Sequence, residues 1–432
     1  MLTTAAALLL LFVGSGLYVG AALGILGGAM GSLYSMFPLL RGVGEISWSA
    51  SADFVLVAVP MFILMGELLL RSGVAEAMYE ALNKWVGHVP GGLMHTNVAV
   101  SALFAATSGS SIATAATVGT VSIPNMSKFG YRPGLFLGTI AAGGTLGILI
   151  PPSINMVLYG SLSETSVSQL YLAALIPGFL MAALFSALVA IACLARPGLA
   201  PRTSAAPWSE RLRALPTLAP PMGLFFLVVG SIYVGLATPT EASALGVTGT
   251  LAYLAARRRL RWDILGAALE STVRTTSMVM FIVIAAFFLN FVFSTIGLTD
   301  LVVQVLGGLD WPPVAVMAMI VLIYLVLGCF VETLTLMVAT TPIIVPIVVH
   351  LGYSPVWFGV LFVILIELAL ITPPIGMNLF VVQSVRGGGP FRDVMVGSLP
   401  FALVMLLMIA LLMAFPDLAL WLPNLYYGRP GA

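Results

Sequence analysis

Long apolar stretches follow one another along the whole chain and are separated by short segments rich in glycine, proline and charged residues. A helix needs about 20 apolar residues to cross a bilayer, and most of these stretches reach or exceed that length. The pattern therefore predicts an all-helical membrane protein with many spans. The stretches lie at about 3–37, 53–71, 92–126, 134–160, 170–195, 217–236, 241–256, 275–294, 312–349, 356–384 and 396–416.

One frame of prolines, glycines and aromatic residues occurs twice, at an offset of 222 residues. Each proline or glycine restricts or frees the backbone in its own way, so such residues rarely align by accident. We interpret the frame as one structural unit used twice. The matched residues are Pro124 and Pro346, Gly130 and Gly352, Tyr131 and Tyr353, Pro133 and Pro355, Phe136 and Phe358, and the pairs Pro151-Pro152 and Pro373-Pro374.

Two stretches are too long for one span and have small or polar residues at their centres. Each is interpreted either as two full spans or as a re-entrant hairpin that returns to the side it entered from. With two hairpins each half crosses the membrane five times, and an odd number of crossings inverts the second half relative to the first. The predicted division is a first inverted repeat at 1–195 (hairpin about 92–126, broken span 134–160), a cytoplasmic linker at 196–213, and a second inverted repeat at 214–432 (hairpin about 312–349, broken span 356–384).

Charge is scarce and unevenly placed. Only 8% of the residues are charged and 60% are hydrophobic, whereas soluble proteins carry about 25% charged residues. The net charge of +1 indicates neither nucleic acid nor an acidic partner. With the linker in the cytoplasm, 15 of the 17 Lys and Arg residues lie inside, as the positive-inside rule requires. This topology places both termini in the periplasm, whichever interpretation of the hairpins holds.

Two mixed segments suggest helices that lie along the membrane surface. The first, at 74–88, carries Glu76, Glu80 and Lys84 among apolar residues. We expect its counterpart near 262–274.

Four breaks interrupt apolar stretches at membrane depth. Irregular backbone there is tolerated only where protein or a water-filled cavity surrounds it. Half-helix C-termini offer free carbonyls to Na⁺, and half-helix N-termini suit an anion. The other interpretation is close helix packing through small residues, but the breaks occur in matched pairs. They lie at Ser108–Ser111, Ile150–Asn155, Gly328 with Glu332–Thr335, and Thr372–Asn378.

Three acidic residues lie within apolar stretches, where a charge is costly and usually functional. Glu67 has Arg71 four residues on, a spacing that favours a structural ion pair. Glu332 and Glu367 are interpreted either as gating or site residues or as buried hydrogen-bonded groups. The inverted repeat and the paired breaks predict a secondary transporter. The alternatives are an intramembrane enzyme with Glu332 and Glu367 as an acid–base pair, and a channel. Scattered histidines make a metal site improbable, and the chain has no P-loop for ATP hydrolysis.

The motifs around these breaks resemble the large membrane subunit of the tripartite ATP-independent periplasmic transporters, the DctM-like family. The resemblance implies Na⁺-driven uptake of a small organic acid, a carboxylate or a sulfonate, by an elevator motion in the bacterial inner membrane. It also implies two partners, a small four-helix membrane subunit and a periplasmic binding protein. The motifs are Ala106-Thr107-Ser108-Gly109-Ser110-Ser111, Ile123-Pro124-Asn125-Met126, Gly147–Ser153, Leu351–Gly359 and Glu367–Phe380.

The breaks and the resemblance together predict two Na⁺ ions in pseudo-symmetric sites, with the organic anion between the hairpin tips. The family usually has Asn two residues before Glu367 and Gly two residues after it, where this chain has Leu365 and Ala369. Ala369 could therefore offer Na⁺ only its carbonyl. The predicted sodium ligands are Ser108, Gly109, Ser111 and Asn155 in one site and Gly328, Ala369 and Thr372 in the other. The predicted substrate-binding residues are Ser110, Pro152, Ser153, Thr333, Thr335 and Asn378.

Overall fold

The computed structural model describes residues 1–201, 204–298, 300–301, 304 and 311–428. Within these residues all regular structure is helical. Five helices in the described part are long and apolar enough to cross a membrane, and two bent helix pairs raise that number to seven. The prediction of an all-helical protein with many apolar helices is confirmed.

The first 70 residues of the chain form four α-helices. The stretch at 3–37 divides into two of them, and a third lies where the sequence pattern predicted no element. A short 3₁₀ turn precedes each of the last two helices, and the chain bends by 61° between them. The helices are α1 (Leu2–Gly14), α2 (Val19–Tyr34), α3 (Val43–Ser51) and α4 (Ala58–Leu70).

The first mixed segment forms α5 (Val74–Val86), which buries Met78 and Tyr79 and exposes Glu76 and Glu80. Its predicted counterpart near 262–274 is wrong as a separate element. Those residues are the first part of α13 (Trp262–Thr295), which continues through the next apolar stretch without a proline. The charged groups do not end the helix because Glu270 and Arg274 pair on its exposed side at 3.5 Å.

Two helical hairpins and two broken helices recur along the chain. α7 and α16 begin and end 222 residues apart, and so do α8 and α17. Both proline pairs between the broken helices contain a cis peptide bond. The hairpins are α6 (Leu93–Ser108) with α7 (Ser111–Lys128), and α15 (Pro313–Gly328) with α16 (Thr333–His350). The broken helices are α8 (Pro133–Leu149) with α9 (Ile154–Leu162), and α17 (Pro355–Ile371) with α18 (Met377–Arg386).

The caps of these helices follow the same spacing. The Ser110 hydroxyl accepts a hydrogen bond from the Ala113 amide at 3.3 Å and caps α7. The Glu332 carboxylate accepts from the Thr335 amide at 3.0 Å and caps α16. Each cap satisfies an amide that has no partner within its own helix. The repeated frame thus specifies helix starts as well as prolines.

The remaining helices complete the two halves. α11 begins within the predicted linker, whose last six residues, 208–213, are helical. A further short helix near the C-terminus follows the last apolar stretch. These helices are α10 (Val167–Ala195), α11 (Trp208–Tyr233), α12 (Pro239–Ala256), α19 (Phe391–Ala414) and α20 (Asp417–Tyr427).

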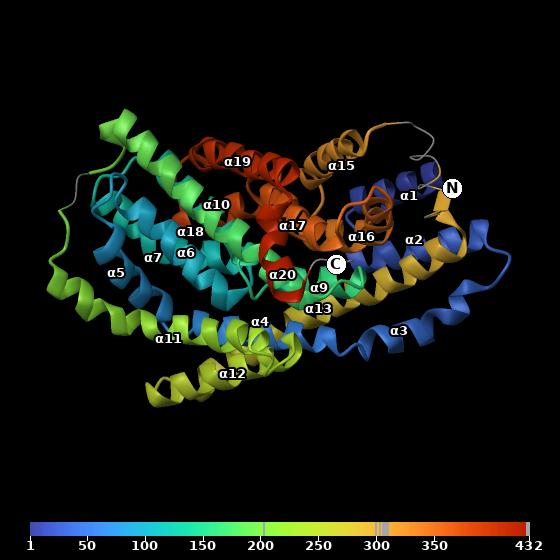
Figure 1. Ribbon diagram of the computed structural model, residues 1–432, viewed down its shortest axis with the longest axis horizontal. Coiled ribbons are helices and arrows are strands. Elements are labelled where there is room, and N and C mark those ends of the chain that lie inside the picture. The colour runs from blue at the N-terminus through green and yellow to red at the C-terminus, as the bar shows by residue number, and fades with distance from the viewer. Residues whose placement is uncertain (202–203, 299, 302–303, 305–310, 429–432) are drawn as a thin grey trace.

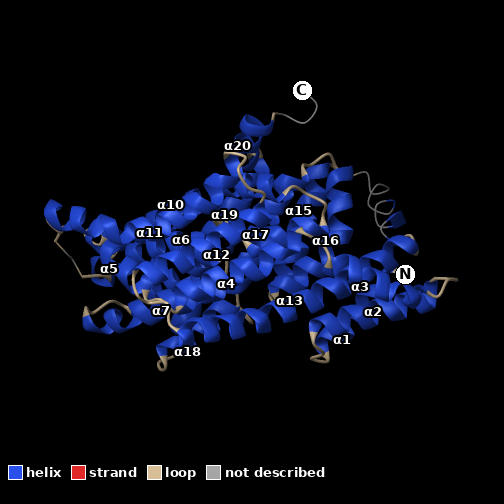
Figure 2. Cartoon of the chain, turned by 90° about the horizontal axis from the view of Figure 1, so that it is seen from below, coloured by secondary structure: helices blue, strands red, loops and turns tan. Residues whose placement is uncertain are grey.

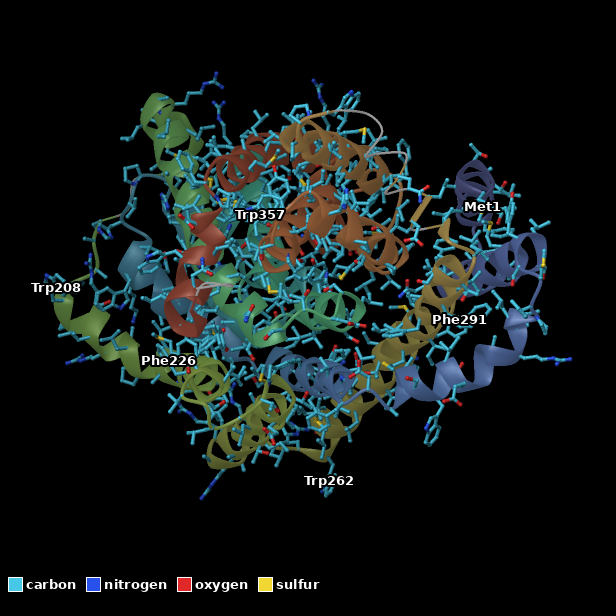
Figure 3. The ribbon with its side chains drawn as sticks, turned by 45° about the vertical axis from the view of Figure 1, so that its right-hand side comes forward. Met1, Trp208, Phe226, Trp262, Phe291 and Trp357 are labelled. Carbon is cyan, nitrogen blue, oxygen red and sulfur yellow. The ribbon has the colours of Figure 1, made fainter. Side chains whose placement is uncertain are left out.

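α17 is the centre of the molecule, and every residue from Val356 to Ile371 is buried. It packs against α8, α10, α15, α16 and α19, while α4, α11, α12 and α13 form a band along one side (Figure 1). Seen from below, α18 and α20 lie at opposite edges (Figure 2). Trp208, Phe226 and Trp262 project from the outside and Trp357 lies in the interior (Figure 3).

The two matched glycine-tyrosine turns lie near opposite ends of α10. The Arg132 amide donates to the Leu199 carbonyl at 3.2 Å, just beyond the C-terminal end of α10. A Cβ placed on Gly359, in the first turns of α17, would lie 2.6 Å from Leu170 near the start of α10. The turn before α8 and the turn before α17 are therefore separated by the length of this helix.

Candidate transport site

The tip of the first hairpin faces an acidic side chain from the other half of the chain. The Ser111 hydroxyl lies 2.8 Å and 2.7 Å from the two carboxylate oxygens of Glu367. Both residues are buried, with relative exposures of 1% each. Glu367 is the only charged residue of α17, and Ser111 is the first residue of α7. The positive end of the α7 dipole therefore points at a buried carboxylate.

The tip itself is shaped by one glycine. Gly109 has φ of +59°, in the left-handed region that glycine adopts without steric cost. A Cβ at Gly109 would lie 3.1 Å from the Pro152 carbonyl oxygen, so the tip rests on the break between α8 and α9. Beside it the Ser108 and Thr114 hydroxyls are 2.9 Å apart. The predicted neighbours Ser108–Ser111 and Pro152 are therefore brought together.

Both asparagines that follow the breaks are buried and incompletely paired. Asn155 and Asn378 are each the second residue of the helix after a break. Asn378 Nδ2 donates to the Ala141 carbonyl at 3.1 Å, which orients the amide and leaves Oδ1 without a hydrogen-bond partner among the described residues. In the same described part of the chain, Asn155 Nδ2 also has no hydrogen-bond partner. Unpaired buried polar atoms are costly, so each calls for a ligand or water.

Asn378 lies beside the first hairpin rather than midway between the tips. A Cβ on Gly144 would lie 2.9 Å from Asn378 Nδ2 and 3.1 Å from the Ser111 carbonyl oxygen. Asn378 and the Ser111 backbone therefore pack closely against the same glycine, and a polar side chain of the second half lies beside the first hairpin tip.

The second tip is packed against α17. A Cβ on Gly328 would lie 2.6 Å from the Cβ of Ala369, so these two predicted neighbours do adjoin. The Thr372 hydroxyl donates to the Leu368 carbonyl at 2.7 Å. The Ala369 carbonyl accepts from the Thr372 amide at 3.4 Å, a long contact that leaves this oxygen weakly bound.

Glu332 is exposed, and its main role here is to hold the second tip together. Its carboxylate accepts from the Thr335 amide and hydroxyl at 3.0 and 3.1 Å and from the Thr333 hydroxyl at 3.1 Å. Both predicted substrate-binding threonines are thus turned toward the cap of α16.

The two breaks differ in exposure. Pro151, Pro152 and Ser153 are buried, whereas Pro374 and Ile375 are exposed. Ser153 caps α9 by accepting from the Met156 amide at 3.4 Å. The first break is closed over by protein and the second is open.

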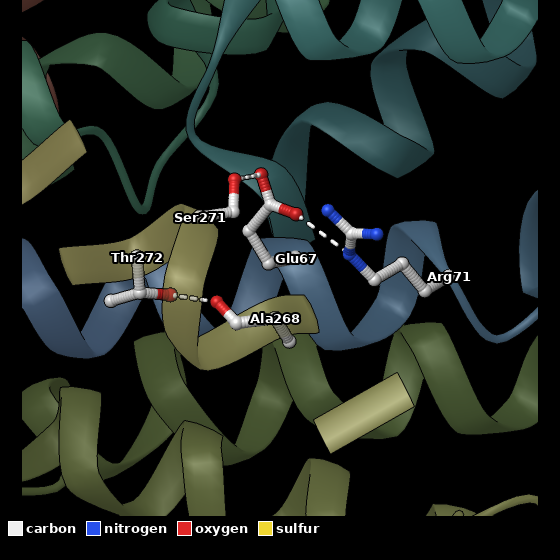
Figure 4. A network of polar contacts seen from close by, with 5 residues as sticks. All are labelled: Glu67, Arg71, Ala268, Ser271 and Thr272. Carbon is white, nitrogen blue, oxygen red and sulfur yellow. Dashed lines mark hydrogen bonds and ion pairs between the residues drawn. The ribbon is translucent and has the colours of Figure 1, made fainter. Parts of the chain in front are cut away.

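Glu67 belongs to a separate network outside the tips (Figure 4). Its carboxylate accepts from Arg71 Nε at 3.1 Å and from the Ser271 hydroxyl at 2.8 Å. The Arg71 ion pair is the one that the spacing of Glu67 and Arg71 predicted, and the Ser271 contact joins α4 to α13. The neighbouring Gly66 meets the hairpin, because its Cβ would lie 2.9 Å from the Ser108 carbonyl oxygen.

Sequence reasoning placed Glu367 next to the second break and missed its contact with the first hairpin. The only signal was a single acid within a run of apolar residues. It also missed Gly66 and Gly144, whose role depends on packing across helices that local pattern does not reveal.

The donor set fits a hard monovalent cation, the ion that the family resemblance implies. Hard cations prefer oxygen ligands, and this region holds a buried carboxylate, buried hydroxyls and an unpaired amide oxygen. No group of three or more His, Cys, Asp and Glu side chains suited to a metal is present in the described part of the chain. The oxygen groups brought together at the first tip include the Ser108 and Ser111 hydroxyls and the Pro152 carbonyl, and these would hold Na⁺ here.

The family model for the "Tripartite ATP-independent periplasmic transporter, DctM component" matches residues 6–418. The chain belongs to this family. It is 34% identical to the C4-dicarboxylate TRAP transporter large permease protein DctM of Pseudomonas aeruginosa, covering 92% of this chain and 93% of that one. It is 31% identical to the sialic acid TRAP transporter large permease protein SiaM of Vibrio cholerae, covering 95% and 94%.

This DctM-family chain also resembles solved structures in fold. The YdaH transporter of Alcanivorax borkumensis matches with a TM-score of 0.64 at 18% identity, covering 98% of this chain and 99% of that one. The relatives are named as transporter permeases, not enzymes. The alternative of an intramembrane acid–base enzyme is therefore set aside, and Glu332 and Glu367 have separate hydrogen-bond partners.

Proposed function

We propose that the chain is the membrane subunit that carries a small organic acid inward, driven by Na⁺. The observation that carries this proposal is the meeting of hairpin tips and helix breaks beside two buried asparagines, Asn155 and Asn378, whose amides are incompletely paired among the described residues. Relatives named for C4-dicarboxylates and for sialic acid support an organic acid as the substrate. The binding protein that delivers the acid would select among such compounds.

We further propose that the two halves are inverted repeats and that the hairpins are re-entrant. The identical offset of α7 to α16 and of α8 to α17 supports the repeat. The position of the two glycine-tyrosine turns near opposite ends of α10 supports the inversion. In this topology the second hairpin opens to the outside, and α18 ends on the cytoplasmic side at Arg386.

The proposed mechanism is an elevator, in which the hairpins and broken helices move as one body past a scaffold. α4, α11, α12 and α13 would belong to the scaffold. Contact between Gly66 and the Ser108 backbone would mark the seam between the two parts. Na⁺, when bound, would supply positive charge that balances the anion and links its passage to the sodium gradient.

The remaining residues of the site would bind and orient. The N-terminal ends of α9 and α18 would face the anion with their positive dipoles, and the unpaired Asn155 Nδ2 would donate to it. Ser110 and Ser153 accept hydrogen bonds from first-turn amides and so hold the starts of α7 and α9 in place. Thr372 and the Ala369 carbonyl would serve the second ion.

The chain would work with two partners, a small four-helix membrane subunit and a periplasmic binding protein. The exposed apolar side chains along α11 and α13 support a membrane partner or lipid on that side, among them Phe226, Met278 and Phe281. The experiment is uptake into proteoliposomes that contain this chain, with each partner added or left out. Uptake that needs both partners supports the proposal; an equal rate with the chain alone contradicts it.

A further inference from the structure

We propose that the turn between α12 and α13 binds the phosphate headgroup of an anionic phospholipid in the inner leaflet of the membrane. The turn runs from Arg257 to Trp262 and reads Arg-Arg-Arg-Leu-Arg-Trp. It holds four of the 17 Lys and Arg residues of the chain. The inference goes beyond the proposed function. It uses the proposed topology, which places this turn in the cytoplasm, and depends on neither the substrate nor the sodium ions.

The first argument is positive charge that the protein leaves unbalanced. All residues from Arg257 to Asp263 are exposed. Arg261 pairs with Asp263 at 3.0 Å, whereas no ion pair among the described residues involves Arg257 or Arg258. The Arg257 guanidinium lies 6.0 Å from the ring centre of Tyr253, a contact that orients it without neutralising it. A cluster of arginines at the cytoplasmic end of a span attracts anionic headgroups, and a guanidinium binds phosphate through paired hydrogen bonds.

The second argument is the fixed shape of the turn. The Arg259 and Leu260 amides both donate to the Leu254 carbonyl, at 2.8 and 3.2 Å. Arg258 has φ of +54°, a left-handed conformation that glycine adopts without steric cost and other L-residues do not. Glycine fills the same position after α7, where Gly130 has φ of +75°. An arginine where the turn itself favours glycine indicates that its side chain has a use.

The third argument is the apolar surface beside the charge. Leu260 and Trp262 are 41% and 87% exposed, and Trp262 projects from the outside of the molecule (Figure 3). Tryptophan is enriched at the level of the lipid headgroups, where its ring meets both hydrocarbon and water. An acidic peptide in water would need only the arginines. Exposed leucine and tryptophan among them favour a bilayer lipid as the ligand.

The turn is also tied to the junction of α4 and α5. The Arg259 guanidinium donates to the Ser72 carbonyl, and a Cβ on Gly73 would lie 3.0 Å from Arg259 Nη1. Around this junction five arginines face three acids, which leaves an excess of two positive charges. They are Arg71, Arg257, Arg258, Arg259 and Arg261, with Glu67, Glu76 and Asp263. A bound headgroup would balance this excess and hold the turn against α4 and α5.

The test is binding of phosphatidylglycerol with a fluorescent acyl chain to the purified full chain, read by fluorescence anisotropy. The micelles contain excess phosphatidylcholine, which fills positions that any lipid can occupy. Arg257→Gln/Arg258→Gln should weaken binding by roughly 25-fold, about fivefold for each arginine near a membrane surface. Arg213→Gln/Arg392→Gln is the matched control. It removes two exposed arginines that stand singly elsewhere, so the affinity should stay at the wild-type value.

The wild-type chain tests the proposal even if the glutamine variant fails to fold. It should prefer phosphatidylglycerol to phosphatidylcholine, and an equal concentration of inorganic phosphate should not displace the lipid. Equal affinity for both lipids, wild-type affinity in the folded glutamine variant, or an equal loss in the control overturns the proposal. Displacement by inorganic phosphate also overturns it and makes the turn a site for free phosphate. The Na⁺ dependence of uptake is a separate measurement, so the proposed function stands or falls independently.

Discussion

The Ser111 hydroxyl lies within 2.8 Å of both carboxylate oxygens of Glu367, although the two residues are 256 positions apart in the chain. The contact joins the first hairpin tip to the last turn of α17, deep inside the protein. Because α17 is buried along its whole length, a change at Glu367 acts directly on the tip and cannot be relieved by solvent.

Opposite membrane sides are expected for the two matched turns. Lys128 and His350 end α7 and α16, and both are exposed. In a chain with Cys193 and Cys329 replaced by alanine, a membrane-impermeant thiol reagent applied outside should label His350→Cys and spare Lys128→Cys. The physical reason is the odd number of crossings between the two positions. Labelling of both cysteines from the same side would contradict the inverted repeat.

Thr372→Ala should raise the Na⁺ concentration needed for half-maximal uptake by roughly fivefold, the loss of about 1 kcal/mol from one oxygen ligand. It should change the affinity for the loaded binding protein much less. Thr248→Ala is the control, since that hydroxyl also bonds the carbonyl four residues back but lies exposed on α12. An unchanged Na⁺ dependence in Thr372→Ala would remove the second break from the ion sites.

Gly66→Ala should destabilise the packing of the proposed scaffold against the first hairpin by about 1–3 kcal/mol. The added Cβ would lie 2.9 Å from the Ser108 carbonyl oxygen and 3.2 Å from Ser108 Cα, and backbone atoms cannot turn aside as a side chain can. Thermal unfolding of the purified chain measures the loss, and uptake should fall with it. Gly24→Ala has open space around it and should change neither. Wild-type stability in Gly66→Ala would show that the seam is looser than these contacts require.

Glu67→Gln tests whether the acid that joins α4 to α13 has a structural role only. The Arg71 and Glu67 side chains are 36% and 19% exposed, so their ion pair contributes only about 0–1 kcal/mol. We expect a small drop in the unfolding temperature and an Na⁺ dependence of uptake equal to wild type. A shifted Na⁺ dependence would mean that Glu67 takes part in coupling.

Much of the architecture follows from local signals in the sequence. Prolines, glycines and capping residues set where helices start, which is why the breaks at Pro151 and Pro373 and the tip at Gly109 were predictable. The short α3 and the extension of α13 over 262–274 were not, because polar residues continue a helix when they lie on its exposed side.

The site was predictable only in part for a different reason. Its members were found because hydroxyls, amides and acids are rare among apolar spans. Their pairing was not, because Glu367 meets Ser111 and Asn378 meets Ala141 across the two halves. Such contacts depend on how helices pack, and a pattern read along one helix carries no information about them.

The most direct test of the account is uptake by the chain reconstituted with its small membrane subunit. The binding protein is first loaded with the organic acid identified in it by mass spectrometry, supplied in radioactive form. An inward Na⁺ gradient should drive accumulation above the equilibrium level, and an equal K⁺ gradient should not. Accumulation that is the same with K⁺, or that persists without any Na⁺, would contradict Na⁺-coupled transport by this protein.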